Sequence, residues 1–543
     1  MNLFHRPSPL QAPAIALFVS LLFASPAPAS DLPVGSAPEK LGTVRFDNSC
    51  NAAAQAHFTR AVALLHSFYW PEVRKELAAT SKEDPTCAMV QWVNAMVAMG
   101  NPYVWPLTGK ALREGMDAVE KARQLGPKTE RERDYINAVE YFFKDADKIP
   151  AQTRQLAYEV AMAKLAEKYP DDVEAQIFYA LALSANYDPN DRSYGNQLRA
   201  AKIFEGILAT KPDHPGVSHY LIHAYDSPPL AQRGLPSAYR YRDIAPSAPH
   251  ALHMPSHIFT RLGMWNDSIA ANTAVINSTR DQTSRLHSWD YMGYAYMQKA
   301  QDEDAKRVLA DIRALQKIEG ESFPAAFALA AIPSRMVLER QRWHEAAALK
   351  LPISEFDFSW QQYPHAEAIL VYARALGAAR LGRVAAAKAD VARLAVLKSA
   401  MLEAKQSYWA GQAEIQIETV NAWLTRAAGK HEEALRQLRA AADHEDGTEK
   451  SAVTPGPIIP VREQLGDMLM AMKRPRLALA EYERAIAKEP NRFRSLYGAA
   501  RAAEAIKDVA SAQKYYRQLL ANADKPQGKH METQHAKQYL ARR

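Results

Sequence analysis

Cysteine is nearly absent from this chain of 543 residues, which has only Cys50 and Cys87. So few cysteines exclude a disulfide-rich mini-domain, and the counts of 22 Gly and 33 Pro exclude collagen and a low-complexity polymer. A hydrophobic share of 48% argues against wholesale disorder. The sequence also lacks a glycine-rich phosphate loop, a G-x-S-x-G elbow and a C-x-x-C pair. These absences argue against nucleotide use, the common type of serine hydrolysis and thioredoxin-like redox chemistry.

Dense runs of Lys and Arg with interleaved aromatic residues are missing as well. The formal net charge of +7 is a mild bias over such a length, so we expect no nucleic-acid partner. Beyond the N-terminal segment, no stretch has the roughly 20 uninterrupted apolar residues that a membrane-spanning helix needs. We therefore expect no membrane span in the mature protein.

The N-terminus has the features of a secretory signal peptide. His5 and Arg6 precede an apolar run over residues 14–24, and Ala27-Pro28-Ala29 matches an A-x-A cleavage site. The sequence thus predicts cleavage after Ala29 and an exported protein, periplasmic or secreted. In such an oxidising compartment Cys50 and Cys87 can form a disulfide. The alternative is two buried free thiols.

The rest of the chain has the pattern of paired helices. Apolar residues recur at i, i+3 and i+4, and alternating β-branched runs are missing. In the segment that starts at Ile459, small residues, Tyr482 and Pro490 recur at the spacing of the tetratricopeptide repeat (TPR), which this segment resembles. We therefore predict an all-α, TPR-like solenoid of helical hairpins, a right-handed superhelix in which each hairpin packs only against its neighbours.

The predicted organisation follows from these patterns. After the signal peptide (1–29) we expect irregular helical hairpins (30–210), central His-rich TPR repeats (211–314), C-terminal TPR repeats (315–522) and a basic tail (523–543). Two long interruptions, 100–108 and 443–460, are either functional insertions or spacers.

The resemblance extends beyond the generic repeat. The segments HFTRAVALLHSF, DPTCAMVQWVNAM, HALHMPSHIFTRLGMW, VTPGPIIPVREQLGDML and PNRFRSLYGAA together resemble a family of exported bacterial TPR proteins. This resemblance implies the fold and export, and it implies no activity.

Histidines fall in phase with the repeat in the central segment. Taking Pro215 and Pro249 as position 1 of successive 34-residue repeats, the histidines fall at positions 2, 5 and 9 and Asp226 at position 12. These positions form one stripe on a helix. In TPR proteins this stripe lines the concave groove, and the resemblance implies the same here. The histidines concerned are His219, His223, His250, His253, His257 and His287.

Two His-x3-His pairs on neighbouring helices are able to supply four nitrogen ligands. We therefore predict that His219, His223, His253 and His257 bind a transition metal such as Zn, Cu or Fe. Additional ligands or outer hydrogen-bond partners are expected from His250, His287, Asp226 and Asp290. An open coordination position would let the ion activate water or dioxygen. The alternatives are a non-catalytic scaffold whose groove binds a peptide, protein or small-molecule ligand, and histidines that serve packing alone.

Further side chains are candidates for the groove around these histidines. Arg335 falls at a groove position and is a candidate for anion binding, and Tyr291 and Trp289 are candidates for the lining of a substrate pocket. Pro255 lies between His253 and His257, where it predicts a kinked helix. The acidic residues before Lys450 either salt-bridge to the groove or form a solvated loop.

Overall fold

The computed structural model describes residues 39–104, 107, 109–188, 191–315, 317–350 and 358–542. The predicted signal peptide lies outside these residues, as does part of the 100–108 interruption. Residues from Lys40 onward form one compact unit, which is described below. Among the described residues, no helix combines the length and the apolar character needed to cross a bilayer.

The regular structure of the described residues is helical, apart from one isolated bridge between Gln301 and Gln527. The first part contains α1 (Ala52–His66), α2 (Trp70–Glu83), α3 (Ala88–Met99), η1 (Pro102–Val104), α4 (Gly109–Leu125), α5 (Glu130–Phe143), α6 (Ala151–Lys168), α7 (Val173–Ala185) and α8 (Gly195–Thr210). The central part contains α9 (Pro215–Ala224), α10 (Ala231–Ile244), α11 (Pro249–His253), α12 (Pro255–Arg261), α13 (Trp265–Ser278), α14 (Gln282–Gln298) and α15 (Asp302–Arg313). The last part contains α16 (Phe323–Leu338), α17 (Trp343–Ala346), η3 (Trp360–Gln362), α18 (Pro364–Arg380), α19 (Val384–Glu403), α20 (Ser407–Ala427), α21 (His431–Asp446), α22 (Val461–Ala471), α23 (Pro475–Lys488), α24 (Phe493–Ala505), α25 (Val509–Asn522) and α26 (Met531–Ala541).

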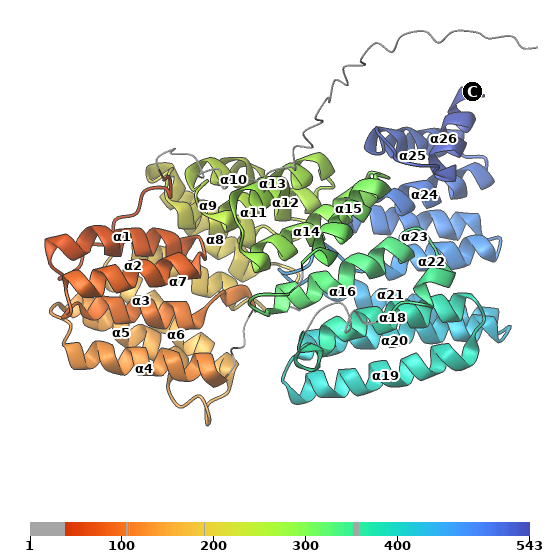
Figure 1. Cartoon of the computed structure of the whole chain (residues 1–543). Helices are drawn as coiled ribbons and strands as arrows, with labels where there is room; N and C mark the ends of the chain where they lie inside the picture. Colours follow the sequence, from red (N-terminus) through yellow and green to blue (C-terminus); the bar gives the residue numbers. More distant parts are fainter. Residues whose placement is uncertain are drawn as a thin grey trace, which may run out of the picture. The chain divides into compact units, whose positions relative to one another are not determined.

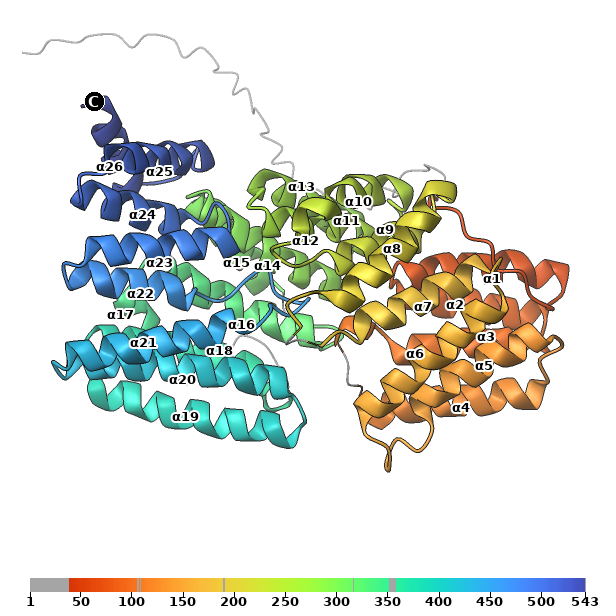
Figure 2. The same ribbon diagram turned by 180° about the vertical axis from the view of Figure 1, so that it is seen from behind.

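Successive helices pack as hairpins, which confirms the predicted all-α, TPR-like array (Figure 1). Helices α1 and α2, α3 and α4, α7 and α8, and α22 and α23 are such pairs, and the same succession is seen from behind in Figure 2. Gly466 on α22 shows why small residues recur: a Cβ there would lie 2.7 Å from the ring of Tyr482 on α23. The absent side chain lets the two helices approach closely.

The helix starts follow the predicted register in the central part. Helices α9, α11 and α14 begin at Pro215, Pro249 and Gln282, 34 and 33 residues apart. Pro255 separates α11 from α12, because its ring nitrogen has no hydrogen to donate to the preceding turn. The first helix of this repeat is therefore divided between His253 and His257.

The expectation that each hairpin packs only against its neighbours is wrong. Helix α1 contacts α9, and α14 contacts α24, although long stretches of sequence separate them. The guanidinium of Arg492 bonds Glu339 at 2.7 Å and the Tyr294 hydroxyl at 2.7 Å, and all three residues are buried. The Trp265 indole donates to the Asn491 carbonyl at 3.0 Å. Buried polar side chains, which the repeat pattern does not encode, thus connect hairpins far apart in the chain.

Cys50 and Cys87 form a disulfide, with their Cα atoms 5.0 Å apart. Cys50 precedes α1 by two residues, and Cys87 is the N-cap residue of α3. The Asn51 side chain accepts a hydrogen bond from Ala54 N and donates to the Glu83 carbonyl. The start of α1 is therefore attached to the end of α2 by a hydrogen bond as well as to α3 by a covalent bond.

Candidate metal centre

Six histidines from the first helices of three consecutive repeats come together in the structure. Helix α9 supplies His219 and His223, α11 supplies His250 and His253, α12 supplies His257 and α14 supplies His287; we call these six residues the histidine cluster. The predicted stripe of positions 2, 5 and 9 thus converges.

The histidine cluster consists of two groups of three. In the α9 group, His219, His223 and His250 each offer a ring nitrogen, and these nitrogens all lie within 4.8 Å of one another. The α12 group, His253, His257 and His287, meets the same criterion. The groups adjoin, since ring centroids of His223 and His257 are 5.8 Å apart and those of His250 and His253 are 6.0 Å apart. The four predicted ligands are therefore divided between the groups, two in each.

Hydrogen bonds fix the rings of the α12 group. His253 Nδ1 lies 2.7 Å from Asn272 Oδ1, and the Asn272 amide nitrogen donates to the Ser268 carbonyl, so Oδ1 is the acceptor. His257 Nδ1 lies 2.9 Å from Asp226 Oδ2. Both Nδ1 atoms therefore carry the hydrogen, and a neutral imidazole has only one.

The two Nε2 atoms of His253 and His257 consequently present lone pairs to each other, 3.0 Å apart. Facing lone pairs repel unless a cation or a shared proton lies between them. Two imidazoles bound to one ion, with metal–nitrogen bonds of about 2.0–2.1 Å, bring adjacent nitrogens to about 3 Å. The 3.0 Å separation of the two Nε2 atoms is therefore compatible with two ligands of one metal ion.

Burial disfavours protonation of these rings. It lowers the pKa of His219, His223, His250, His253 and His287 well below the ordinary value, and neighbouring histidines lower it further. Burial also lowers the pKa of His257, against the opposing effect of Asp226. Unprotonated rings keep a lone pair for a metal.

Asp226 is an outer partner of the cluster. Burial alone would raise the pKa of its carboxyl, but Lys450 and Arg261 hold that pKa well below the ordinary value. Lys450 Nζ lies 2.8 Å from Oδ2, and Arg261 Nε donates to Oδ1 at 2.9 Å. The carboxylate therefore orients His257 from behind the ring, as carboxylates do for metal-bound histidines.

The other predicted site residues have different surroundings. The Tyr291 hydroxyl lies 3.4 Å from His257 Nδ1 and donates to the Thr454 carbonyl at 3.3 Å. Arg335 is fully buried, pairs with Asp290 and donates to Thr454 Oγ1 at 3.0 Å. Trp289 is buried in the hydrophobic core, with the Arg285 guanidinium over its ring. Among these side chains, Tyr291 is the one that contacts the histidine cluster.

A further buried group, His66, Glu174 and His214, is not among the predicted site residues. Glu174 accepts from His66 Nε2 at 2.8 Å and from His214 Nε2 at 2.9 Å, while His66 Nδ1 bonds the Tyr220 hydroxyl. Burial opposes ionisation of Glu174, but the two histidines lower its pKa well below the ordinary value. The polar atoms of this group mostly bond one another, which is typical of a structural network.

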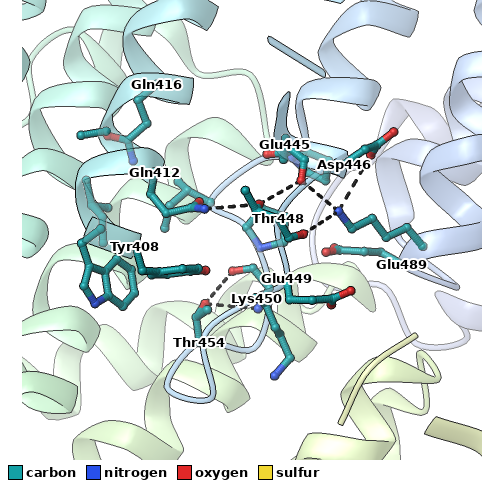
Figure 3. A pocket seen from close by; sticks show the side chains of 18 of the residues that line it. Tyr408, Gln412, Gln416, Glu445, Asp446, Thr448, Glu449, Lys450, Thr454 and Glu489 are labelled. Carbon is teal, nitrogen blue, oxygen red and sulfur yellow. Dashed lines mark hydrogen bonds and ion pairs between the residues drawn. The ribbon is translucent and has the colours of Figure 1, made fainter. Parts of the chain in front are cut away.

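A pocket lies beside the cluster, under the segment 447–460. The space between its lining residues is about 870 Å³, a figure that includes open solvent outside the walls. Figure 3 shows Tyr408 and Gln416 on one side of it and Asp446 and Glu489 on the other. Lys450 lines the pocket and also bonds Asp226, which in turn bonds His257 of the histidine cluster.

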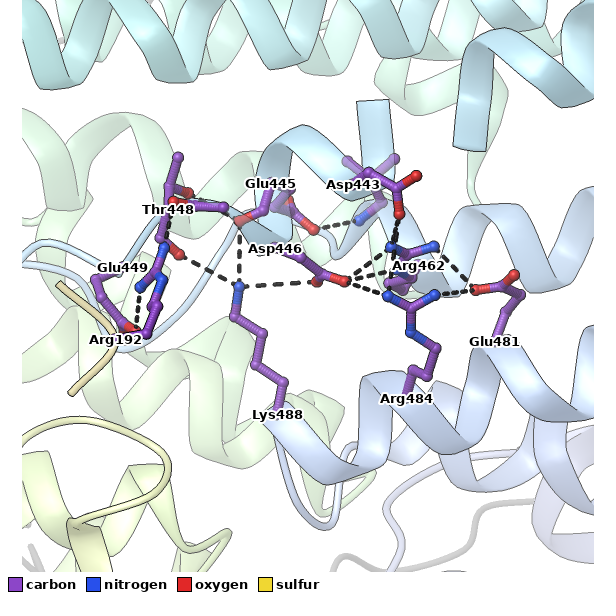
Figure 4. A network of polar contacts seen from close by, with 12 residues as sticks. Arg192, Asp443, Glu445, Asp446, Thr448, Glu449, Arg462, Glu481, Arg484 and Lys488 are labelled. Atoms are coloured by element: carbon purple, nitrogen blue, oxygen red, sulfur yellow. Dashed lines mark hydrogen bonds and ion pairs between the residues drawn. The ribbon is translucent and has the colours of Figure 1, made fainter. Parts of the chain in front are cut away.

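Ion pairs hold the far side of this pocket. Figure 4 shows Lys488 directed at Glu445 and Asp446; its Nζ donates to the Glu445 carbonyl at 3.2 Å. Arg462 bonds Asp446 at 2.8 Å and Glu481 at 3.0 Å. Burial raises the pKa of Glu445 to about 7.

The phase of the repeat did not identify Asn272, Glu174 or the role of Lys450. Asn272 lies on α13, the second helix of its hairpin, whereas the predicted stripe concerns first helices. Lys450 reaches Asp226 from 224 residues further along the chain. The repeat phase carries no signal for contacts of either kind.

Comparisons with known proteins identify no function. No family model matches the chain, and no curated protein matches it. Among solved structures it is similar to yeast Tom70, at 12% identity over 90% of this chain and 88% of that one, with a TM-score of 0.30. It is also similar to a chain of Naa15/Naa10 bound to HypK-THB (12% identity, 90% and 74% coverage, TM-score 0.24) and to the P58(IPK) TPR domain (12% identity, 68% and 99% coverage, TM-score 0.21). At this level of similarity, function has to be argued from the site itself.

Proposed function

We propose that this protein binds a transition-metal ion in the histidine cluster, with His253, His257 and His287 as its ligands. The observation that carries the proposal is the pair of Nε2 atoms facing each other at 3.0 Å while both Nδ1 atoms donate elsewhere. Imidazole ligands suit Zn, Cu, Fe or Ni, whereas Mg and Ca prefer oxygen. Three protein ligands leave further positions open, which is typical of catalytic rather than structural sites.

We further propose that the protein acts outside the cytoplasm. The predicted signal peptide would direct it to the periplasm or out of the cell, and the Cys50–Cys87 disulfide suits an oxidising compartment.

The test of the metal proposal is the metal content of the purified mature protein. We expect stoichiometric transition metal in the wild type and its loss from the double variant His253→Ala/His257→Ala. The matched control, His57→Ala/His444→Ala, removes two partly exposed histidines outside the cluster and should keep the metal. Metal-free wild-type protein after expression with the metals supplied would contradict the proposal, provided that circular dichroism shows it folded.

A second candidate function is a scaffold that binds a peptide or protein partner. Helical-repeat arrays commonly present extended binding surfaces, and the pocket beside the cluster combines the aromatic Tyr408 and Trp409 with charged side chains. Titration with acidic, basic and neutral peptides, followed by tryptophan fluorescence, tests it. A saturable change that Trp409→Phe abolishes supports this function; no saturable change with any peptide class counts against it.

A further inference from the structure

The α9 group lies outside the ligand set proposed above. We propose that His219, His223 and His250 form a second metal site, so that the histidine cluster holds two ions side by side. This inference rests on the proposed function for the nature of the ligand, but its evidence comes from different residues.

The α9 group shares one feature with the α12 group, a histidine whose Nδ1 donates to a fixed acceptor. His219 Nδ1 donates to the His66 carbonyl at 2.6 Å, so its Nε2 carries a lone pair, and this atom lies 3.2 Å from His250 Nε2. His223 Nε2 is buried and has no hydrogen-bond partner among the described residues. A buried nitrogen without a partner is costly unless a ligand binds it.

Aromatic rings hold these histidines in place. His223 stacks on Tyr103 with ring centroids 4.1 Å apart, and His219 stacks on Tyr241 at 5.3 Å. Phe68 packs against His219 at 4.6 Å and His250 at 5.5 Å. Rings fixed in this way lose little freedom when they bind an ion.

Phe68 also carries backbone strain. Its φ of 51° is in the left-handed region, which a bulky side chain rarely adopts. The turn places the Phe68 ring against His219 and His250.

The two groups are separate sites because they share no ligand. The Nε2 atoms of His219 and His250 lie 3.2 Å apart in one group, and those of His253 and His257 lie 3.0 Å apart in the other. The group of His66, Glu174 and His214 differs, because Glu174 already bonds both histidines.

Titration of the metal-free protein with Cu(II) alone tests the inference. We expect two equivalents bound by the wild type, and one by either His219→Ala/His250→Ala or His253→Ala/His287→Ala. In the wild type the two Cu(II) ions should interact, so that the electron paramagnetic resonance signal per copper is smaller than in either variant. The control His57→Ala/His444→Ala should bind two equivalents.

The outcomes separate the two proposals. If the wild type binds one equivalent of Cu(II) and the variant His219→Ala/His250→Ala still binds it, the second site is overturned and the proposed function stands. No binding by the wild type overturns both. If an alanine variant fails to fold, the wild-type stoichiometry and signal intensity decide, with two interacting ions in favour and one isolated ion against.

Discussion

Asp226 is predicted to serve both the metal and the fold, and Asp226→Asn tests both roles without changing the volume of the side chain. The substitution keeps an acceptor oxygen for His257 Nδ1, but it removes the negative charge. Lys450 and Arg261, each within 3 Å of the carboxylate and about 5% exposed in their side chains, then lose their main partner.

Breaking a buried ion pair costs about 3–5 kcal/mol. Glu449 lies 3.9 Å from Arg261 and compensates part of this loss, so we expect about 2–4 kcal/mol in the free energy of unfolding of the metal-free protein. Loss of an outer partner of a metal-bound histidine weakens metal binding about 10–100-fold.

Urea unfolding of the metal-free protein and competition with a chelator measure the two effects. Asp443→Asn is the control, because its carboxylate is mostly exposed and faces Arg462 rather than the cluster. A change below about 1 kcal/mol in Asp226→Asn, together with unaltered metal affinity, would refute the role given to this carboxylate.

Three further predictions concern the fold. Gly466→Ala should lower the free energy of unfolding by about 1–3 kcal/mol, because the new Cβ would lie 2.7 Å from the Tyr482 ring. Gly411→Ala should not lower it, because a Cβ at Gly411 has nothing within 4 Å. Equal urea midpoints for the two variants would contradict this prediction. Replacing Cys50 and Cys87 by Ser should cost about 4 kcal/mol, given their separation of 37 residues, and an unchanged midpoint would contradict it. Glu445 has a folded-state pKa of about 7, against an ordinary value of 4.5. Its contribution to the free energy of unfolding is therefore present below about pH 4.5 and is lost as the pH rises to about 7. Glu445→Gln should remove this loss of stability, and identical pH profiles of the wild type and the variant would count against it.

The helical hairpins could be predicted from the sequence because their signals are local. Apolar spacing and small residues mark each helix pair, and prolines mark the starts of α9 and α11. The phase of the histidines predicted their convergence, because equivalent positions of stacked repeats lie on one surface.

The repeat phase of the histidines could not predict that the cluster divides into two groups. It depends on hydrogen bonds of individual rings, such as His219 to the His66 carbonyl and His253 to Asn272. These partners lie on other helices and at unrelated repeat positions. The contact of Lys450 with Asp226 likewise depends on how distant hairpins meet.

The central claim is that imidazole nitrogens hold a metal ion, and X-ray absorption at the edge of the bound metal tests it most directly. We expect nitrogen ligands at about 2.0–2.1 Å, with the outer-shell scattering of several imidazole rings. A shell of oxygen or sulfur ligands without imidazole scattering would contradict the account.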